Sequence, residues 1–115
     1  MSFRPIFRIQ MTAFACALAL AGSAAVAQQA GEIHVTYSNG QFQPSELRIA
    51  ADKPFVLRIK NLDAKAMEFE SKSLRVEKVV AAKGEGTINV RALKAGRYEF
   101  YDDFNEKARG MLVAQ

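Results

Sequence analysis

The chain has 115 residues and carries 16 Lys plus Arg against 12 Asp plus Glu, with one His and one Cys. A chain of this length has room for one small domain with one core. A single Cys excludes an internal disulfide framework. The small excess of positive charge is not gathered into basic tracts of the kind that nucleic-acid-binding domains carry, so we expect no nucleic acid partner.

The N-terminal segment has the three parts of an export signal. Arg4 and Arg8 precede an uncharged, Ala- and Leu-rich stretch that ends in Ala25-Val26-Ala27. A basic start, an apolar middle and an Ala-x-Ala end are what a cleaved secretory signal needs. A membrane anchor would need roughly 20 strongly apolar residues, whereas Thr12, Gly22 and many Ala dilute this stretch. The sequence therefore predicts a signal peptide over residues 1–27 and a single domain over residues 28–115.

Removal of residues 1–27 changes what the domain can do. It leaves 14 basic against 12 acidic residues and takes away Cys16, the only Cys. A metal site with a thiolate ligand is therefore excluded from residues 28–115. The only His, His34, has no Ser or Thr motif near it that would support a hydrolase of the Ser-His type.

The predicted domain consists of short segments in which apolar and polar residues alternate, as in strands buried on one face. In chain order these segments are 32–37, 46–49, 55–60, 67–70, 74–77, 88–91, 98–101 and 112–113. Turn-forming clusters with Gly separate several of them, and no stretch sustains a helical period. The pattern predicts an all-β Greek-key sandwich of about seven or eight strands. Residues 79–82 do not alternate and are compatible with either a strand or one helical turn.

The series Leu93-x-x-Gly96-x-Tyr98 enters one of these strands. A Tyr at such a position can fold its hydroxyl back onto the preceding corner of a Greek-key sandwich. The alternative is a plain core Tyr, and both interpretations are consistent with the same fold.

The C-terminal part of the sequence resembles the copper loop of the cupredoxins. The matching residues are 96–105, which read GRYEFYDDFN, followed by Gly110-Met111. The resemblance places Asp102 where that family has its Cys ligand, Asn105 where it has a His, and Met111 where it has the axial Met. A blue-copper site requires a thiolate, so the domain is not expected to be a blue-copper electron carrier.

A second segment resembles the small EfeO-type cupredoxin-like domains, which carry Glu-x-Glu where blue-copper proteins carry His. It comprises Lys60-Asn61-Leu62-Asp63 and Glu68-Phe69-Glu70-Ser71. The resemblance implies a periplasmic protein that binds a copper or iron ion. It also implies an accessory role in iron uptake, presenting or oxidising iron for a membrane iron permease or another periplasmic uptake component.

The candidate ligands follow from this resemblance and from the donor atoms available. The main candidates are Glu68, Glu70, Asp102 and Met111, and the weaker ones are Met67, Asp103 and Asn105. Oxygen donors dominate this set, and such sites suit iron-group cations or Cu(II). Strand parity places Asp102 on the inward face of Tyr98 and Phe100 and Asp103 on the outward face.

Three alternatives without metal compete with this hypothesis. Lys107 or Arg109 can pair with Asp102 or Asp103 and neutralise the carboxylates. Glu68 and Glu70 can form a solvated strand face, because Glu is mostly exposed, and the Met residues can be core fillers. The corresponding function is a metal-free β-sandwich that acts as a docking or structural module in the cell envelope.

Overall fold

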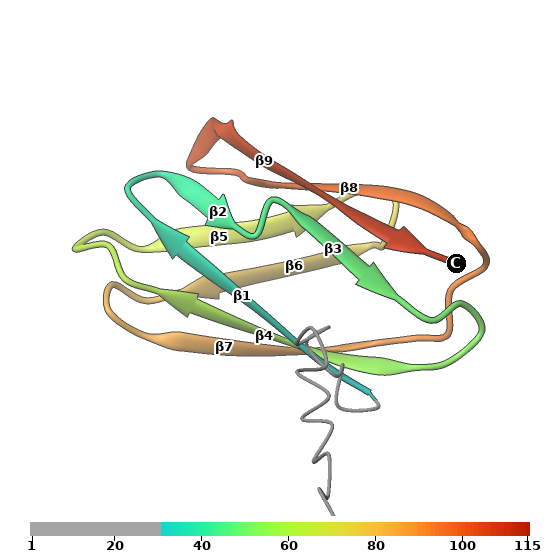
Figure 1. Ribbon diagram of the computed structural model, residues 1–115. Coiled ribbons are helices and arrows are strands. Elements are labelled where there is room, and N and C mark those ends of the chain that lie inside the picture. Colours follow the sequence, from blue (N-terminus) through green and yellow to red (C-terminus); the bar gives the residue numbers. More distant parts are fainter. Residues whose placement is uncertain (1–30) are drawn as a thin grey trace, which may run out of the picture.

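The computed structural model describes residues 31–115, which form an all-β sandwich of two layers (Figure 1). The predicted signal peptide, residues 1–27, lies outside the described residues. Within residues 31–115 there is no helix long and apolar enough to span a membrane. The predicted fold class is confirmed, and the described part of the chain contains nine strands rather than seven or eight.

The nine strands form two sheets. They are β1 (Glu32–Ser38), β2 (Gln41–Gln43), β3 (Glu46–Ile49), β4 (Phe55–Asn61), β5 (Met67–Ser71), β6 (Val76–Val80), β7 (Glu85–Val90), β8 (Gly96–Asp102) and β9 (Asn105–Ala114). One sheet has the order β2-β1-β4-β7, and the other has the order β3-β9-β8-β5-β6. Both sheets mix parallel and antiparallel pairs, since β1 runs parallel to β4 and β3 runs parallel to β9.

The chain changes sheets between β2 and β3. A tight turn first connects β1 to β2, with Asn39 and Gly40 both at positive φ, 54° and 67°. Two successive residues of this kind form the turn that matches the natural twist of a hairpin. After β2, Pro44 and Ser45 carry the chain across to β3, and Ser45 accepts a 2.8 Å hydrogen bond from the Met111 N–H of β9.

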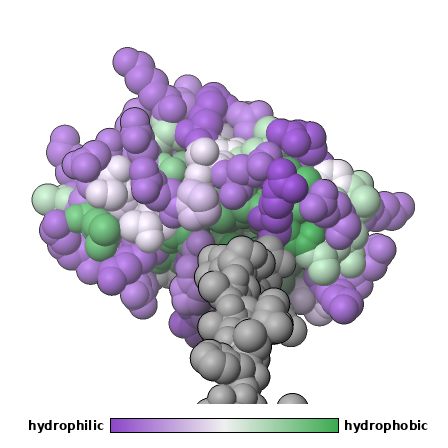
Figure 2. Space-filling model, in the orientation of Figure 1, coloured by the Kyte–Doolittle hydropathy of each residue, from purple (hydrophilic) through white to green (hydrophobic). Residues whose placement is uncertain are grey.

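The core fills the space between the sheets. Every strand contributes side chains to it, β6 through Val80, and Leu74 joins it from the turn between β5 and β6. At its centre the ring of Phe42 meets the rings of Phe69 and Phe100 edge-on, with centroids 6.1 Å and 4.9 Å apart. Edge-to-face contacts of this kind add to the free energy gained from burial alone. The outer surface is mostly hydrophilic on the face shown in Figure 2.

Two sequence expectations about strands need correction. The segment 74–77 is not a strand along its length, because residues 72–75 form a turn and β6 begins at Val76. Leu74 lies in this turn and is nevertheless fully buried. The alternation of apolar and polar residues at 74–77 therefore reflects the burial of Leu74 and not a strand. The open question at residues 79–82 is resolved as strand up to Val80.

Two further strands differ from expectation at the end of the chain and near its start. The sequence did not predict β2, which is only three residues long. It also placed the last strand at 112–113, whereas β9 begins at Asn105. The first half of β9 is polar and charged, so the sequence pattern did not indicate a strand there. In this half only Asn105 and Arg109 pair with β8. The predicted Tyr corner is confirmed, since the Tyr98 hydroxyl donates a 2.7 Å hydrogen bond to the Lys94 carbonyl.

Candidate metal site

Adjoining strands place acidic side chains on the outer face of the larger sheet. Along β5, Met67 and Phe69 point into the core, so Glu68 and Glu70 point to the outer face. Glu70 lies directly opposite Glu77 of β6 and opposite Tyr101 of β8. Directly opposed residues in an antiparallel pair have neighbouring side chains. The strand register therefore gathers carboxylates that are far apart in the sequence.

The turn after β8 adds a third carboxylate to this face. Asp103 follows the last residue of β8, and its N–H donates a 2.9 Å hydrogen bond to the Glu68 carbonyl. One carboxylate oxygen from each of Glu68, Glu70 and Asp103 lies within 4.8 Å of the others. We refer to these three residues as the carboxylate cluster. Glu68 is buried, Glu70 is half-buried and Asp103 is exposed, so the cluster is open to solvent on one side.

The charges of the cluster repel one another. A hydrogen bond with the Glu77 carboxyl is the largest cause that raises the pKa of Glu68 to about 7, followed by burial and by the charges of Glu77, Asp103 and Glu70. Burial is the largest cause that raises the pKa of Glu70, and the negative charge of Asp103 follows. Like charges disfavour the ionised form. The site therefore favours a proton or a cation.

No basic side chain of residues 31–115 forms an ion pair with the cluster. Arg109, which we considered as a partner of Asp102 or Asp103, instead pairs with Glu99. Its guanidinium also lies over the ring of Tyr101, 5.3 Å from the centroid. Lys107 forms no ion pair with either Asp. Within residues 31–115, therefore, no Arg or Lys neutralises the cluster through an ion pair. This pairing was one of the metal-free alternatives considered for the carboxylates.

The cluster fits a hard or borderline divalent cation. Carboxylate oxygens around a small divalent ion bind at about 2.1 Å and are therefore at most about 4.2 Å apart. The three oxygens lie within 4.8 Å of one another, so the widest pair would have to approach by at most about 0.6 Å to hold such an ion. Three carboxylates supply oxygen donors only, which suit iron-group cations and tetragonal Cu(II). The Tyr101 hydroxyl, beside Glu70, is an additional oxygen next to the site.

Asp102 lies on the opposite side of the same sheet and does not join the cluster. The inward parity predicted for it is confirmed, because only 2% of its surface is exposed. Its Oδ2 accepts a 2.6 Å hydrogen bond from the Tyr37 hydroxyl, and its Oδ1 accepts bonds of 2.9 Å and 3.0 Å from the N–H groups of Glu68 and Phe104. Three donors thus satisfy this carboxylate without an ion. Asp102 positions the strand and turn that carry the cluster.

The remaining candidate ligands are also separate from the cluster. Met67 is fully buried in the core. Met111 lies opposite Glu99 of β8. Glu99 is three residues from Asp102, so Met111 lies about 10 Å from Asp102 along the strand direction. Asn105 is exposed at the start of β9 and contacts the Tyr37 hydroxyl. The four main candidates, Glu68, Glu70, Asp102 and Met111, are therefore not assembled as one site.

Sequence reasoning did not identify Glu77 and Tyr101 as members of this surface. Both follow from the register, since Glu77 and Tyr101 flank Glu70 on the two neighbouring strands. The alternation of apolar and polar residues indicated only that the side chains of Glu77 and Tyr101 point outward. The pairing of β5 between β6 and β8 was not available from the pattern, because consecutive strands are not always neighbours in a Greek key.

The sequence matches the family described as "Cupredoxin-like domain" over residues 10–114. The chain belongs to the cupredoxin-like family. This cupredoxin-like protein is also 31% identical over 83 residues to an uncharacterized protein of Rickettsia prowazekii, an alignment that covers 71% of this chain and 66% of the relative. The chain thus spans about two thirds of that relative's length.

Solved structures share the fold of this cupredoxin-like protein at low sequence identity. Auracyanin A, a "blue" copper protein from Chloroflexus aurantiacus, superposes with a TM-score of 0.63 at 14% identity and covers 73% of this chain and 98% of its own. The metal-binding domain of the Cu(I)-exporting P-type ATPase CopA of Streptococcus pneumoniae, solved with Cu(I), gives 0.60 at 15% identity, with 73% and 84% covered. Amicyanin from Paracoccus versutus gives 0.58 at 12% identity, with 73% and 81% covered. At these identities the likeness concerns the fold alone.

Proposed function

We propose that this chain is a periplasmic cupredoxin-like protein that binds a copper or iron ion through carboxylates. The ligands are those of the carboxylate cluster, Glu68, Glu70 and Asp103. The observation that carries the proposal is the convergence of three carboxylate oxygens within 4.8 Å with no ion pair to a basic side chain of residues 31–115. A cation relieves the repulsion that raises the pKa of Glu68 and of Glu70.

Copper and iron are supported by different observations. Two of the structures with the same fold, auracyanin A and the CopA domain, are copper proteins by name. The resemblance of Glu68-Phe69-Glu70 to EfeO-type domains supports iron, and the oxygen donors suit both iron and Cu(II). Because residues 28–115 contain no Cys, the bound ion would lack the thiolate that defines a blue-copper centre.

The proposed biological role is an accessory one in iron uptake. The predicted signal peptide supports export to the periplasm, and a cluster that is open to solvent on one side suits an ion that must be released again. The protein would hold the ion near a membrane iron permease or another periplasmic uptake component. A partner of this kind must remove the ion from the open side of the cluster, where Asp103 is exposed.

Metal titration of residues 28–115 tests the site. We expect one equivalent of Cu(II) or Fe(II) to bind, measured by calorimetry under anaerobic conditions for Fe(II). Glu70→Gln and Asp103→Asn should each weaken binding at least tenfold, because each removes one of three charged ligands. Glu85→Gln, on the other sheet, is the matched control and should leave binding unchanged.

Two outcomes would contradict the proposal. If the native protein binds neither ion, or if Glu70→Gln and Asp103→Asn bind as tightly as the native protein, the cluster is not a metal site. The metal-free docking module then becomes the better hypothesis. The uptake role is tested separately by deleting the gene in the native host and comparing growth under iron limitation with growth under copper excess.

A further inference from the structure

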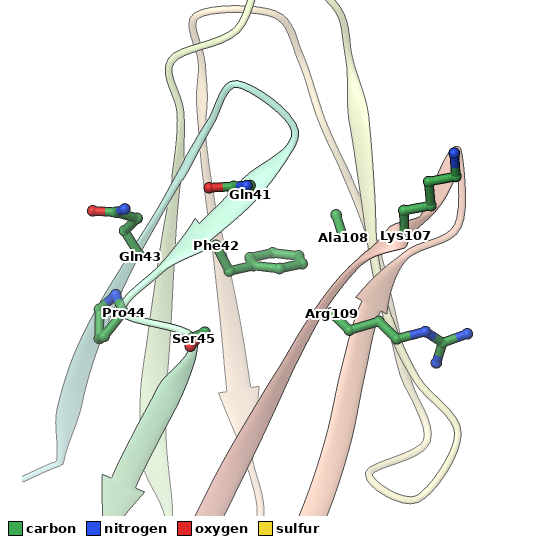
Figure 3. A pocket seen from close by; sticks show the side chains of 8 residues that line it. All are labelled: Gln41, Phe42, Gln43, Pro44, Ser45, Lys107, Ala108 and Arg109. Carbon is green, nitrogen blue, oxygen red and sulfur yellow. The ribbon is translucent and has the colours of Figure 1, made fainter.

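A groove separates the edges of the two sheets on the side of the molecule where the chain crosses from β2 to β3. Its volume is about 610 Å³. Gln41, Phe42, Gln43, Pro44 and Ser45 line one wall, and residues 107–109 of β9 line the other (Figure 3). The groove lies apart from the carboxylate cluster, because none of the cluster residues lines it.

Both walls of the groove are strand edges without a partner among residues 31–115. β2 is the edge strand of its sheet. The ladder between β3 and β9 begins only at Glu46 and Met111, so the first six residues of β9 have no strand on that side. The N–H of Met111 points toward this side, where it bonds Ser45. Since strand residues alternate in direction, the N–H of Arg109 points the same way, into the groove.

The register between β8 and β9 is irregular beside the groove. Tyr101 of β8 pairs with Arg109, but the next residue, Asp102, pairs with Asn105. Residues 106–108 therefore have no partner in β8. An edge that presents free N–H and C=O groups is a template for another extended chain. Strand addition to such an edge is a recurrent mode of peptide recognition, in which the backbone supplies affinity and alternate side chains supply specificity.

The side chains of the groove define what kind of peptide fits. Phe42 and Ala108 are buried and point toward each other across its floor, whereas the charged ends of Lys107 and Arg109 point away from the floor toward the outer rim (Figure 3). A strand beside β9 must follow the same alternation. One set of its side chains would contact the apolar floor, and the other would face two cations.

We propose that this groove binds an extended peptide segment of a partner protein by strand addition to β9, with apolar residues alternating with acidic ones. Charge complementarity selects this occupant, since both charged residues of the rim are basic. Arg109 is paired with Glu99, whereas Lys107 has no ion-pair partner among residues 31–115, so Lys107 is the cation that an acidic side chain of the peptide would meet. A small-molecule site would instead be lined mostly by apolar side chains. This proposal is independent of the metal function.

The experiment uses residues 28–115, which include both sheets and the whole core, and a capped peptide of alternating Val and Glu residues. On titration, the amide signals of residues 107–109 and of Gln41 and Gln43 should shift in two-dimensional NMR spectra. The Arg109 amide should become protected from hydrogen exchange. Absence of binding, or shifts confined to other surfaces, would overturn the proposal.

Two controls separate strand addition from simple charge attraction. Methylation of the peptide nitrogens that face β9 should abolish binding, while methylation of those on the opposite edge should not. Lys107→Glu should weaken binding of the Glu-containing peptide about fivefold, as expected for loss of an exposed ion pair. The same variant should bind a peptide with Lys in place of Glu more tightly than the Glu-containing peptide. Lys53→Glu, at an exposed turn, should change neither affinity.

Other outcomes decide against the proposal. Binding that is indifferent to N-methylation would show that the backbone edge is not used. Self-association of the protein through this groove, measured by sedimentation and lost in Lys107→Glu, would show that a second copy of the chain is the occupant instead.

Discussion

The Tyr37 hydroxyl donates a 2.6 Å hydrogen bond to Asp102 and thereby joins β1 of one sheet to the end of β8 in the other. The two residues are 65 positions apart in the sequence. Asp102 also accepts the N–H groups of Glu68 and Phe104. This one buried carboxylate therefore fixes the first sheet, the strand that carries Glu68 and the turn that carries Asp103 relative to one another.

Tyr37→Phe should lower the free energy of unfolding by about 1.5–3 kcal/mol, because it removes a donor from a buried charged acceptor. In a domain of this size the melting temperature should fall by roughly 4–8 °C for each kcal/mol. Tyr98→Phe is the matched control, since its hydroxyl donates to an exposed backbone carbonyl, and it should cost about 1 kcal/mol or less. Equal effects of the two substitutions in thermal unfolding would contradict a special role of Asp102.

The stability of the metal-free protein should depend on pH through Glu68. Its pKa in the folded protein is raised from 4.5 to about 7, with the Glu77 hydrogen bond as the largest cause. A raised carboxyl pKa means that the folded state holds the proton more tightly than the unfolded state. The contribution is fully present below about pH 4.5 and is lost as the pH rises through about 7.

This dependence is measured by urea unfolding at several pH values in the presence of a chelator. The native protein should lose stability between about pH 4.5 and 7, and Glu68→Gln should flatten that part of the profile. Gln keeps the length of the side chain and can still hydrogen-bond Glu77. Glu85→Gln should retain the slope of the native protein. A native profile that rises with pH over this window is the result that would refute the expectation.

The sequence was sufficient for the fold class because burial alternates along most strands. The inward parity of Phe100 and Asp102 and the corner made by Tyr98 were predicted in the same way and are seen in the structure. These features depend on residues within one strand or one turn. The local pattern carries the necessary information, since the side-chain period of a strand is two.

The composition of the candidate site could be predicted only in part because it depends on contacts between distant strands. Glu68 and Glu70 were identified from the resemblance, but the third member of the cluster is Asp103 rather than Asp102. Nothing in the local sequence shows that Tyr37 supplies a donor to Asp102 across the sandwich. Contacts between distant strands therefore decide whether a carboxylate accepts hydrogen bonds from the protein, as Asp102 does, or remains available to an ion, as Asp103 does.

Asn61 should be important for the loops at the end of the sandwich. Its buried side-chain amide donates to the carbonyls of Lys65, at 2.8 Å, and Ala81, at 3.2 Å, and its Oδ1 accepts the Asp63 N–H. Asn61→Ala leaves these groups unpaired, and an unsatisfied buried polar group costs about 1–3 kcal/mol. We expect a loss of about 3 kcal/mol in chemical unfolding. Asn89→Ala, on the exposed face of β7, is the control and should change stability by less than about 0.5 kcal/mol.

Gly110 is required for the close approach of β9 to the Phe100 ring. A Cβ at this position would lie 2.2 Å from Phe100 Cζ and 2.9 Å from the Ser45 carbonyl oxygen. The ring is fully buried and packs edge-on against Phe42, so it has little room to move. Gly110→Ala should therefore destabilise the protein by about 1–3 kcal/mol, the usual cost of overpacking a core.

A double-mutant cycle identifies the cause of this loss. Phe100→Leu removes the ring atoms that meet the new methyl group, so the combined variant Gly110→Ala with Phe100→Leu should be more stable than the sum of the two single changes predicts. Gly96→Ala is the control, because its nearest neighbours would be 3.7 Å away, an ordinary contact. If the effects of Gly110→Ala and Phe100→Leu are simply additive in urea unfolding, the clash with the ring is not what makes glycine necessary at this position.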